Sequence, residues 1–477
     1  MGLRCLSYRP RVSTPLVNEE INSSPNFNNI VWDHNQVMAA SLPIRSFIFT
    51  KLLLVSLIFM GLTEICNSAS FTEKAAKLLE GHARVLAAEA SANSLREAAR
   101  ISHKEWYPFL SIATSKGKEI RDNATGTADT RKIAADLNLT LTQPVFDSGT
   151  RSYRTKVARM RLVQAGDEIE LVKQSLLLEA ISAQVSLISS TKLVKYALNS
   201  VANIKRQAQL ENARVEKGAG LSTDVLQAKV QLAGAESRYF QSVNALKASR
   251  NRYKAVFGET AVNERTLKDI AIPEALIPTD IEDVVSKALN SNLQIKSLDI
   301  NRRISRTEID LSYSEQLLPT IDLVVERKYK RDIGGNTGKA REDIIKLQAN
   351  FSLNLGFSSL NSLKLAKYNY AAVSSQLQDA SAIIEESARN SYDQYQAVLQ
   401  NSKILQNQAN ISSEFLKLAR KERKLGKRSL IDVLSGETAE INAKSDAESA
   451  NSQLIISAYS ILSVIGILKL EAVKLVQ

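Results

Sequence analysis

The sequence is poor in the residues that build compact globular cores and catalytic sites. Its 477 residues include only 9 prolines and 18 glycines, and 6% of its side chains are aromatic. Such a composition favours extended helices over thick cores. The three histidines are scattered, and the sequence has no glycine-rich phosphate loop. We therefore expect a protein that is not an enzyme and that uses no metal or other cofactor.

Cysteine is confined to the first 69 residues, as Cys5 and Cys66. Within them, Arg45–Ala69 has basic residues, then an apolar run, then small residues, which is the pattern of a secretory signal peptide. The apolar run is shorter than the roughly 20 residues that a membrane anchor needs. We predict a leader over 1–69, made of a signal peptide at 38–69 and an upstream extension at 1–37. The mature chain then has no thiol for a disulfide or a metal site.

Positive charge exceeds negative charge, but no basic cluster is present. Residues 70–477 carry 57 Lys and Arg against 46 Asp and Glu, a net charge of +11. A basic chain can bind nucleic acid. Because the charges are spread out and the chain is exported, we expect solvated faces and no nucleic acid partner.

Two tracts are long enough to form very long helices. Thr150–Lys217 has no proline and one glycine, and Ser358–Leu425 has neither. Each would be about 100 Å long at 1.5 Å per residue. Apolar residues recur at heptad-like spacing, which predicts helices packed side by side as in a coiled coil. A second helix is predicted after each tract, at Thr223–Val256 and Ser429–Ile465.

A similar motif connects the two helices of each pair. Lys217–Lys229 reads KGAGLSTDVLQAK, and Leu425–Glu437 reads LGKRSLIDVLSGE. A glycine followed by Ser or Thr and Asp ends one helix and starts the next. We predict the tips of two antiparallel helical hairpins. The expected turn residues are Gly218, Gly220, Leu221, Gly426 and Ser429.

Shorter helices precede each long tract, at Phe71–Trp106 and Ile281–Leu317, and each is followed by a proline, Pro108 or Pro319. The sequence then alternates apolar and polar residues, notably over Ile345–Leu355. This predicts two strand hairpins, at about 108–146 and about 319–356. A soluble sandwich would alternate too, but four strands are too few to enclose a core beside such helices. In an exported chain the alternation fits the wall of a membrane barrel that several chains close together.

The order of predicted elements divides the mature chain into two repeats, 70–270 and 271–477. Read in order, LTLTQPVFDSGTR at Leu139–Arg151 and the two tip motifs resemble the outer-membrane factor (TolC-type) family of bacterial efflux and type I secretion channels. The resemblance covers nearly all of the mature chain.

The resemblance implies a mainly α fold with a pair of membrane β-hairpins, assembled as a homotrimer. Twelve strands, four from each protomer, would form a β-barrel in the outer membrane of a Gram-negative bacterium. The long hairpins would continue it into the periplasm as an α-barrel. The implied partners are outer-membrane lipid, a periplasmic adaptor protein and an inner-membrane pump.

The resemblance also implies a gate at the hairpin tips, with the second hairpin lying inward. Arg428 matches an arginine of the family's gate, and Asp432 matches the first acidic residue that lines the constriction. Thr223 and Asp224 match the locking partners of the first tip. A tyrosine that assists the lock in some members falls on Arg423.

Local helix capping is a second explanation for the same residues. Ser429 followed by Asp432 resembles a capping box, and Asp224 stands where a helix dipole favours an anion. The family's second acidic position falls on Ser435, so we expect a single acidic ring.

The barrel–helix junctions are expected at Pro108, Pro144, Gly149 and Pro319. The second copy reads NLGFSSLNSLK, without the proline and the Asp-Ser-Gly of the first, so we expect a different junction there. The alternative function is a periplasmic adaptor or a coiled-coil scaffold. Adaptors usually carry one helical hairpin beside compact β-rich domains, whereas two hairpins are predicted here.

Overall fold

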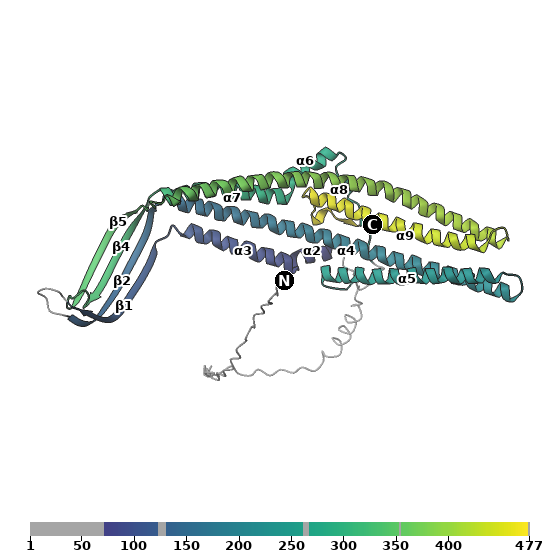
Figure 1. Cartoon of the computed structure of the whole chain (residues 1–477), viewed down its shortest axis with the longest axis horizontal. Helices are drawn as coiled ribbons and strands as arrows, with labels where there is room; N and C mark the ends of the chain where they lie inside the picture. The colour runs from purple at the N-terminus through teal and green to yellow at the C-terminus, as the bar shows by residue number, and fades with distance from the viewer. Residues whose placement is uncertain (1–70, 123–129, 261–266, 353, 476–477) are drawn as a thin grey trace, which may run out of the picture. The chain divides into compact units, whose positions relative to one another are not determined.

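The computed structural model describes residues 71–122, 130–260, 267–352 and 354–475, and the predicted leader at 1–69 lies outside them. Two helical hairpins form most of the described chain (Figure 1). In the first, α4 (Thr150–Glu216) is followed by α5 (Ser222–Phe257). In the second, α8 (Ser358–Lys424) is followed by α9 (Leu430–Val464). The four predicted helices are confirmed, and α4 packs against both α5 and α9.

The two shorter helices are each broken in two, where the sequence predicted one continuous helix. The first pair is α2 (Phe71–Gly81) and α3 (Ala83–Lys104), and the second is α6 (Ile281–Ser291) and α7 (Leu293–Leu317). The breaks have a local cause, because the side chain at each break caps the next helix. His82 Nδ1 accepts a hydrogen bond from the Arg84 backbone N–H (3.1 Å), and Asn292 Oδ1 accepts one from the Gln294 N–H (2.8 Å).

The largest apolar cluster lies where the two halves of the chain meet. Buried side chains of α2, α4, α6, α8 and α9 contribute to it, including Leu176, Ile181 and Leu462. Short elements border the cluster: β3 (Ile270–Ala271) pairs with β6 (Lys474–Leu475), and 3₁₀ turns lie at Glu274–Leu276 and Leu470–Ala472. Among the described helices, α4 alone is long and apolar enough to cross a membrane, but half of its apolar stretch is buried in the protein. We therefore interpret α4 as a core helix.

The four predicted strands form one antiparallel sheet in the order β1-β2-β4-β5. They are β1 (Phe109–Arg121), β2 (Thr130–Phe146), β4 (Thr320–Arg331) and β5 (Lys339–Asn350). The alternating patterns of Pro108–Ser115, Leu137–Thr142 and Thr320–Arg327 predicted shorter strands, and β1, β2 and β4 extend further into the polar loops. β5 instead ends before Leu355, because Asn354 forms a turn by accepting the Gly356 N–H (2.8 Å). Residue 353 lies outside the described chain.

The sheet has one apolar face and one polar face. Successive side chains of a strand point to opposite faces. The register aligns Leu110, Leu141, Val325 and Ile345 in one row across all four strands. Glu326, Lys328, Glu342 and Lys346 lie on the opposite face.

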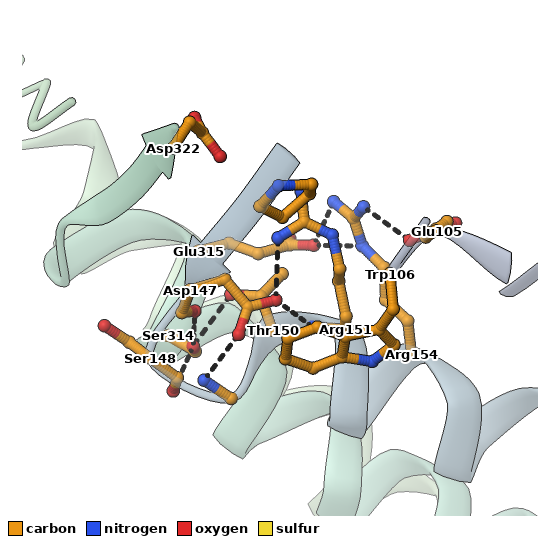
Figure 2. A network of polar contacts seen from close by, with 12 residues as sticks. Glu105, Trp106, Asp147, Ser148, Thr150, Arg151, Arg154, Ser314, Glu315 and Asp322 are labelled. Carbon is orange, nitrogen blue, oxygen red and sulfur yellow. Dashed lines mark hydrogen bonds and ion pairs between the residues drawn. The ribbon is translucent and has the colours of Figure 1, made fainter. Parts of the chain in front are cut away.

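The sheet joins the helices through a compact polar network at the start of α4 (Figure 2). The buried Asp147 carboxylate accepts the backbone N–H groups of Gly149 (3.1 Å) and Arg151 (2.8 Å). Thr150 Oγ1 lies 2.8 Å from Ser314 Oγ, which ties this junction to α7. The Asp-Ser-Gly of the first motif therefore caps α4 and joins it to the other half of the chain.

The predicted junction residues lie at this point of the fold. Gly149 has a φ of +91°, and Pro144 lies in β2 beside a register shift. Pro108 and Pro319 directly precede β1 and β4. The second junction is built differently, with Phe357 at a φ of +54° before α8.

Candidate functional site

The two hairpin tips share one turn geometry. Gly218 (φ +72°) and Gly426 (φ +74°) both have left-handed backbones, as glycine does after a helix end. In the first tip the Ala219 N–H donates to the Arg214 carbonyl (2.8 Å), and in the second the Lys427 N–H donates to the Glu422 carbonyl (2.9 Å). The predicted helix stops are therefore confirmed.

The tips differ two residues after the glycine. A Cβ at Gly220 would lie 3.0 Å from Val215 Cγ2, so this tip has little room for a side chain. Its counterpart Arg428 pairs with Glu422 (Nε to Oε2, 2.8 Å), and its guanidinium lies 5.1 Å from the centroid of the Phe415 ring. Both partners of Arg428 belong to its own hairpin.

The other predicted tip residues lie in or beside the first turns of α5 and α9. Ser429 Oγ accepts the Asp432 backbone N–H (3.2 Å), which confirms the capping interaction. Leu221 precedes α5 with an extended backbone, and Thr223 and Asp224 lie in its first turn. Asp432 is exposed. The pairing of Arg428 with Asp224 concerns neighbouring hairpins and stays a prediction.

Side chains of both hairpins pack together just above the tips. Ile204 and Ala208 of α4, Ala228 of α5, and Leu430 and Leu434 of α9 form one buried apolar cluster. This cluster seats the start of α9 on the first hairpin. We call the contact surface between the two hairpins at this level the seam.

An ion pair crosses the seam. Arg423 of α8 reaches Glu211 of α4, with 2.8 Å between Nη2 and Oε1, and the Glu211 side chain is only 4% exposed. Arg423 also donates to the Arg428 carbonyl (3.1 Å), and Arg214 also binds Glu211 (3.1 Å). Arg423 therefore links the second tip to a buried carboxylate of the first hairpin.

A second buried carboxylate lies further along the seam. Glu437 of α9 accepts hydrogen bonds from Arg420 Nε (2.9 Å) and from Asn203 Nδ2 of α4 (3.4 Å). Burial raises the pKa of Glu437 above the ordinary carboxyl value, although the Arg420 guanidinium acts in the opposite direction. Proton uptake at this residue therefore falls closer to neutral pH than at an exposed glutamate.

The two carboxylates line a pocket of about 340 Å³. Five basic side chains surround them: Arg206, Arg214, Arg420, Arg423 and Lys424. Sequence reasoning noted Arg423 only as a departure from a family tyrosine, and it missed Glu211 and Glu437. For Glu437 the available signal was its place one helical turn from Val433 and Ile441, which indicates a buried partner. Glu211 lies between Leu210 and Asn212 and offers no such signal.

The fold is shared with outer-membrane channels. It is similar to the outer membrane protein VceC of Vibrio cholerae, with a TM-score of 0.71 at 14% identity, over 83% of this chain and 96% of that one. The open state of the MtrE outer membrane channel of Neisseria gonorrhoeae gives a TM-score of 0.67 at 14% identity, over 83% and 88% of the two chains. The chain therefore has the fold of these outer-membrane channel structures.

The sequence narrows this class to a family. Residues 75–259 and 284–466 match the profile of the outer membrane efflux proteins. The outer membrane protein TolC of Vibrio cholerae is 21% identical over 414 residues, which are 86% of this chain and 91% of that protein. TolC of Escherichia coli is 22% identical over 353 residues, 70% of each chain. The chain belongs to the outer membrane efflux protein family and resides in the outer membrane.

Proposed function

We propose that three copies of this chain form the exit duct of a tripartite efflux or type I secretion system. A periplasmic adaptor and an inner-membrane pump are the partners at the hairpin tips. The four-stranded sheet supports the trimer, since a sheet with an apolar face and two open edges needs further strands to close in a membrane. The corresponding order of elements in the two halves of the chain supports the two repeats.

The observation that carries the gating part of the proposal is the ion pair of Arg423 with Glu211. It joins the second tip to the first hairpin at the level where the duct would narrow. In the closed duct this pair and the packed seam hold the second hairpin inward. When the adaptor docks, the hairpin tips contact the adaptor in place of each other. The second hairpin then moves outward.

Arg428 has a second role in this proposal. It is held by Glu422 in its own hairpin, with 28% of its side chain exposed. In the trimer, Asp224 of a neighbouring copy competes with Glu422 for the guanidinium. Exposed pairs contribute only about 0–1 kcal/mol, so such an exchange changes the free energy little and suits a switch.

The change Glu211→Gln tests the gate. It removes the charge that holds Arg423 and leaves a partly buried arginine without its anionic partner, which destabilises the closed seam. We expect the single-channel conductance of the full chain in planar bilayers to rise severalfold. Glu236→Gln is the matched control, because it removes an exposed carboxylate from α5 of the same hairpin. Equal conductance of the Glu211 variant and the control would contradict the gate.

The alternative of a periplasmic adaptor is not favoured, because the matched family is one of outer membrane efflux proteins. Fractionation distinguishes the two functions. A duct stays in the outer membrane after salt washing, whereas an adaptor without a membrane barrel is released.

A further inference from the structure

The apolar face of the sheet ends in a group of cations near the β1–β2 and β4–β5 turns. Three rows of the register carry most of them: Lys116 aligns with Ala135, Arg331 and Lys339; Tyr329 aligns with Arg341; and Arg327 aligns with Asp343. All of these positions share the face of Leu110 and Ile345, because they are an even number of residues away along their strands. We call the seven cations on this face the basic collar: Lys116, Lys118, Arg131, Arg327, Arg331, Lys339 and Arg341.

The collar lies close to the apolar part of the sheet. On β4 the apolar positions run only from Ile321 to Val325, and on β5 only from Ala349 to Ile345. Each run is about 13 Å long at 3.3 Å per residue. The lipid-facing band of outer-membrane barrels is about 25 Å tall. Arg331 lies ten residues beyond Ile321, which is about 33 Å along the strand and about 25 Å in height at a strand tilt of about 40°. In a barrel the outermost row of the collar would therefore lie at the headgroup edge of this band.

The aromatic residues fix the other edge of this band. Phe146 and Phe351 are exposed at the helix end of the sheet, and Tyr329 is exposed in the collar itself. Aromatic side chains gather at the two interfaces of a membrane. The collar is thus at the interface further from the helices, which is the outer leaflet.

Within the chain the collar is incompletely neutralised. Asp343 binds both Arg327 (2.6 Å) and Arg341 (2.5 Å), and Arg331 lies 3.6 Å from Asp332 of the turn. Among the described residues, the seven cations minus these two aspartates leave an excess of five positive charges on each chain.

The opposite face of the same strands provides the contrast. There Lys330 binds Glu342 (2.8 Å), and Glu326 binds both Lys328 (2.5 Å) and Lys346 (2.9 Å). Lys328, Lys330 and Lys346 of the polar face are therefore paired with carboxylates of the protein. Most cations of the apolar face have no carboxylate partner among the described residues, so they are available to bind an external anion.

We propose that the basic collar binds the phosphate groups of lipopolysaccharide in the outer leaflet. The inference rests on the proposed barrel, which turns the apolar face toward lipid. A phosphorylated glycolipid fits both parts of the surface: its acyl chains cover Val325 and Ile345, and its phosphates reach the arginines and lysines above them. Arginine in particular binds phosphate through paired N–H donors.

Substitution of one register row tests the proposal. The triple variant Lys116→Gln, Arg331→Gln and Lys339→Gln removes three cations of the collar. The control variant Lys132→Gln, Lys328→Gln and Lys330→Gln removes three cations from the opposite face of the same sheet. Binding is measured on the detergent-solubilised full chain, as the lipid concentration that gives half of the maximal rise in melting temperature. The added lipids are lipid A with two phosphates, the same lipid without phosphates, and phosphatidylglycerol.

We expect the collar variant to bind diphosphorylated lipid A roughly tenfold or more weakly than the unchanged chain, since each cation adds to the attraction of an anionic lipid surface. The control should bind within about twofold of it. Equal losses in the two variants, or equal binding of dephosphorylated lipid A, would overturn the proposal. Equal binding of phosphatidylglycerol would show a general preference for anionic lipid and would also overturn it.

Channel conductance and lipid A binding distinguish failure of the basic collar from failure of the proposed duct. If the unchanged chain forms no channel in planar bilayers but binds lipid A through the collar, the proposed function fails and the collar stands. If the unchanged chain conducts but the collar variant binds lipid A as well as the control variant does, the lipid-binding proposal fails and the proposed duct is unaffected. A gel assay of oligomeric state shows whether the collar variant still assembles.

Discussion

At the scale of single residues, the unusual groups of this chain are carboxylates buried between helices. Glu437 has a pKa raised by burial, and Arg420 and Asn203 hold its two oxygens. Because Asn203 belongs to the first hairpin, the ionisation state of Glu437 affects the contact between the hairpins. Loss of the Glu437 charge would weaken its hydrogen bonds with Asn203 and Arg420.

Glu437 gives a testable pH dependence of stability. Its pKa in the folded chain lies above the unfolded value, so the folded state binds more protons between the two values. Stability from this group is present at low pH and is lost as the pH rises through the folded pKa. In Glu437→Gln we expect the melting temperature to change less as the pH rises above about 4.3, the ordinary glutamate pKa. In the control Glu236→Gln the change of melting temperature with pH should match that of the unchanged chain. An equal change with pH in all three proteins would show that Glu437 does not contribute to the pH dependence.

At the scale of elements, helix ends were predicted well where a backbone signal marks them. Gly218 and Gly426 end α4 and α8 within one residue of the predicted positions. The breaks at His82 and Asn292 were not predicted. At each break the side chain accepts a hydrogen bond from a backbone N–H of the next helix, and histidine and asparagine also occur inside helices, so neither residue marks a break by its type. Strand lengths were underestimated where charged residues of the collar interrupt the alternation of polar and apolar side chains.

Two glycines allow the role of the tip turn to be measured. Gly426 has a left-handed backbone with open space around it, so Gly426→Ala adds only backbone strain. We expect it to lower the free energy of unfolding by about 1 kcal/mol. Gly166 lies inside α4, also with open space, and Gly166→Ala should raise stability by about 0.5–1 kcal/mol. Chemical denaturation of the two variants checks both signs, and the same sign in both would contradict the turn geometry.

At the scale of the whole molecule, the sequence predicted the two hairpins and the four strands but not the contacts between the hairpins. Arg423 and Glu211 are 212 residues apart in sequence and come from different hairpins. Local patterns cannot show such a pair, because it depends on how α8 and α4 are rotated against each other. The tip turns were predicted from their glycine motif and the gate residues from the resemblance, whereas the seam is visible only in the structure.

Ion selectivity tests the assembled duct. Asp432 is exposed in the first turn of α9, and three copies around a pore would concentrate negative charge. We expect Asp432→Asn to lower the permeability ratio of cations to anions severalfold in planar bilayers. Asp446→Asn, an exposed change further along the same helix, is the control. An unchanged ratio in the Asp432 variant would remove this residue from the pore lining.

The matched lengths of α4 and α8, at 67 residues each, constrain how such a chain can evolve. Deleting one residue would turn the rest of that helix by about 100° and carry its buried face away from its neighbours. Substitutions have no such effect, and solved structures only 14% identical share the fold over 83% of the chain. Lineages of this protein should thus vary freely in residue identity. They should change in length only by paired insertions of about seven residues, two helical turns, in both helices together.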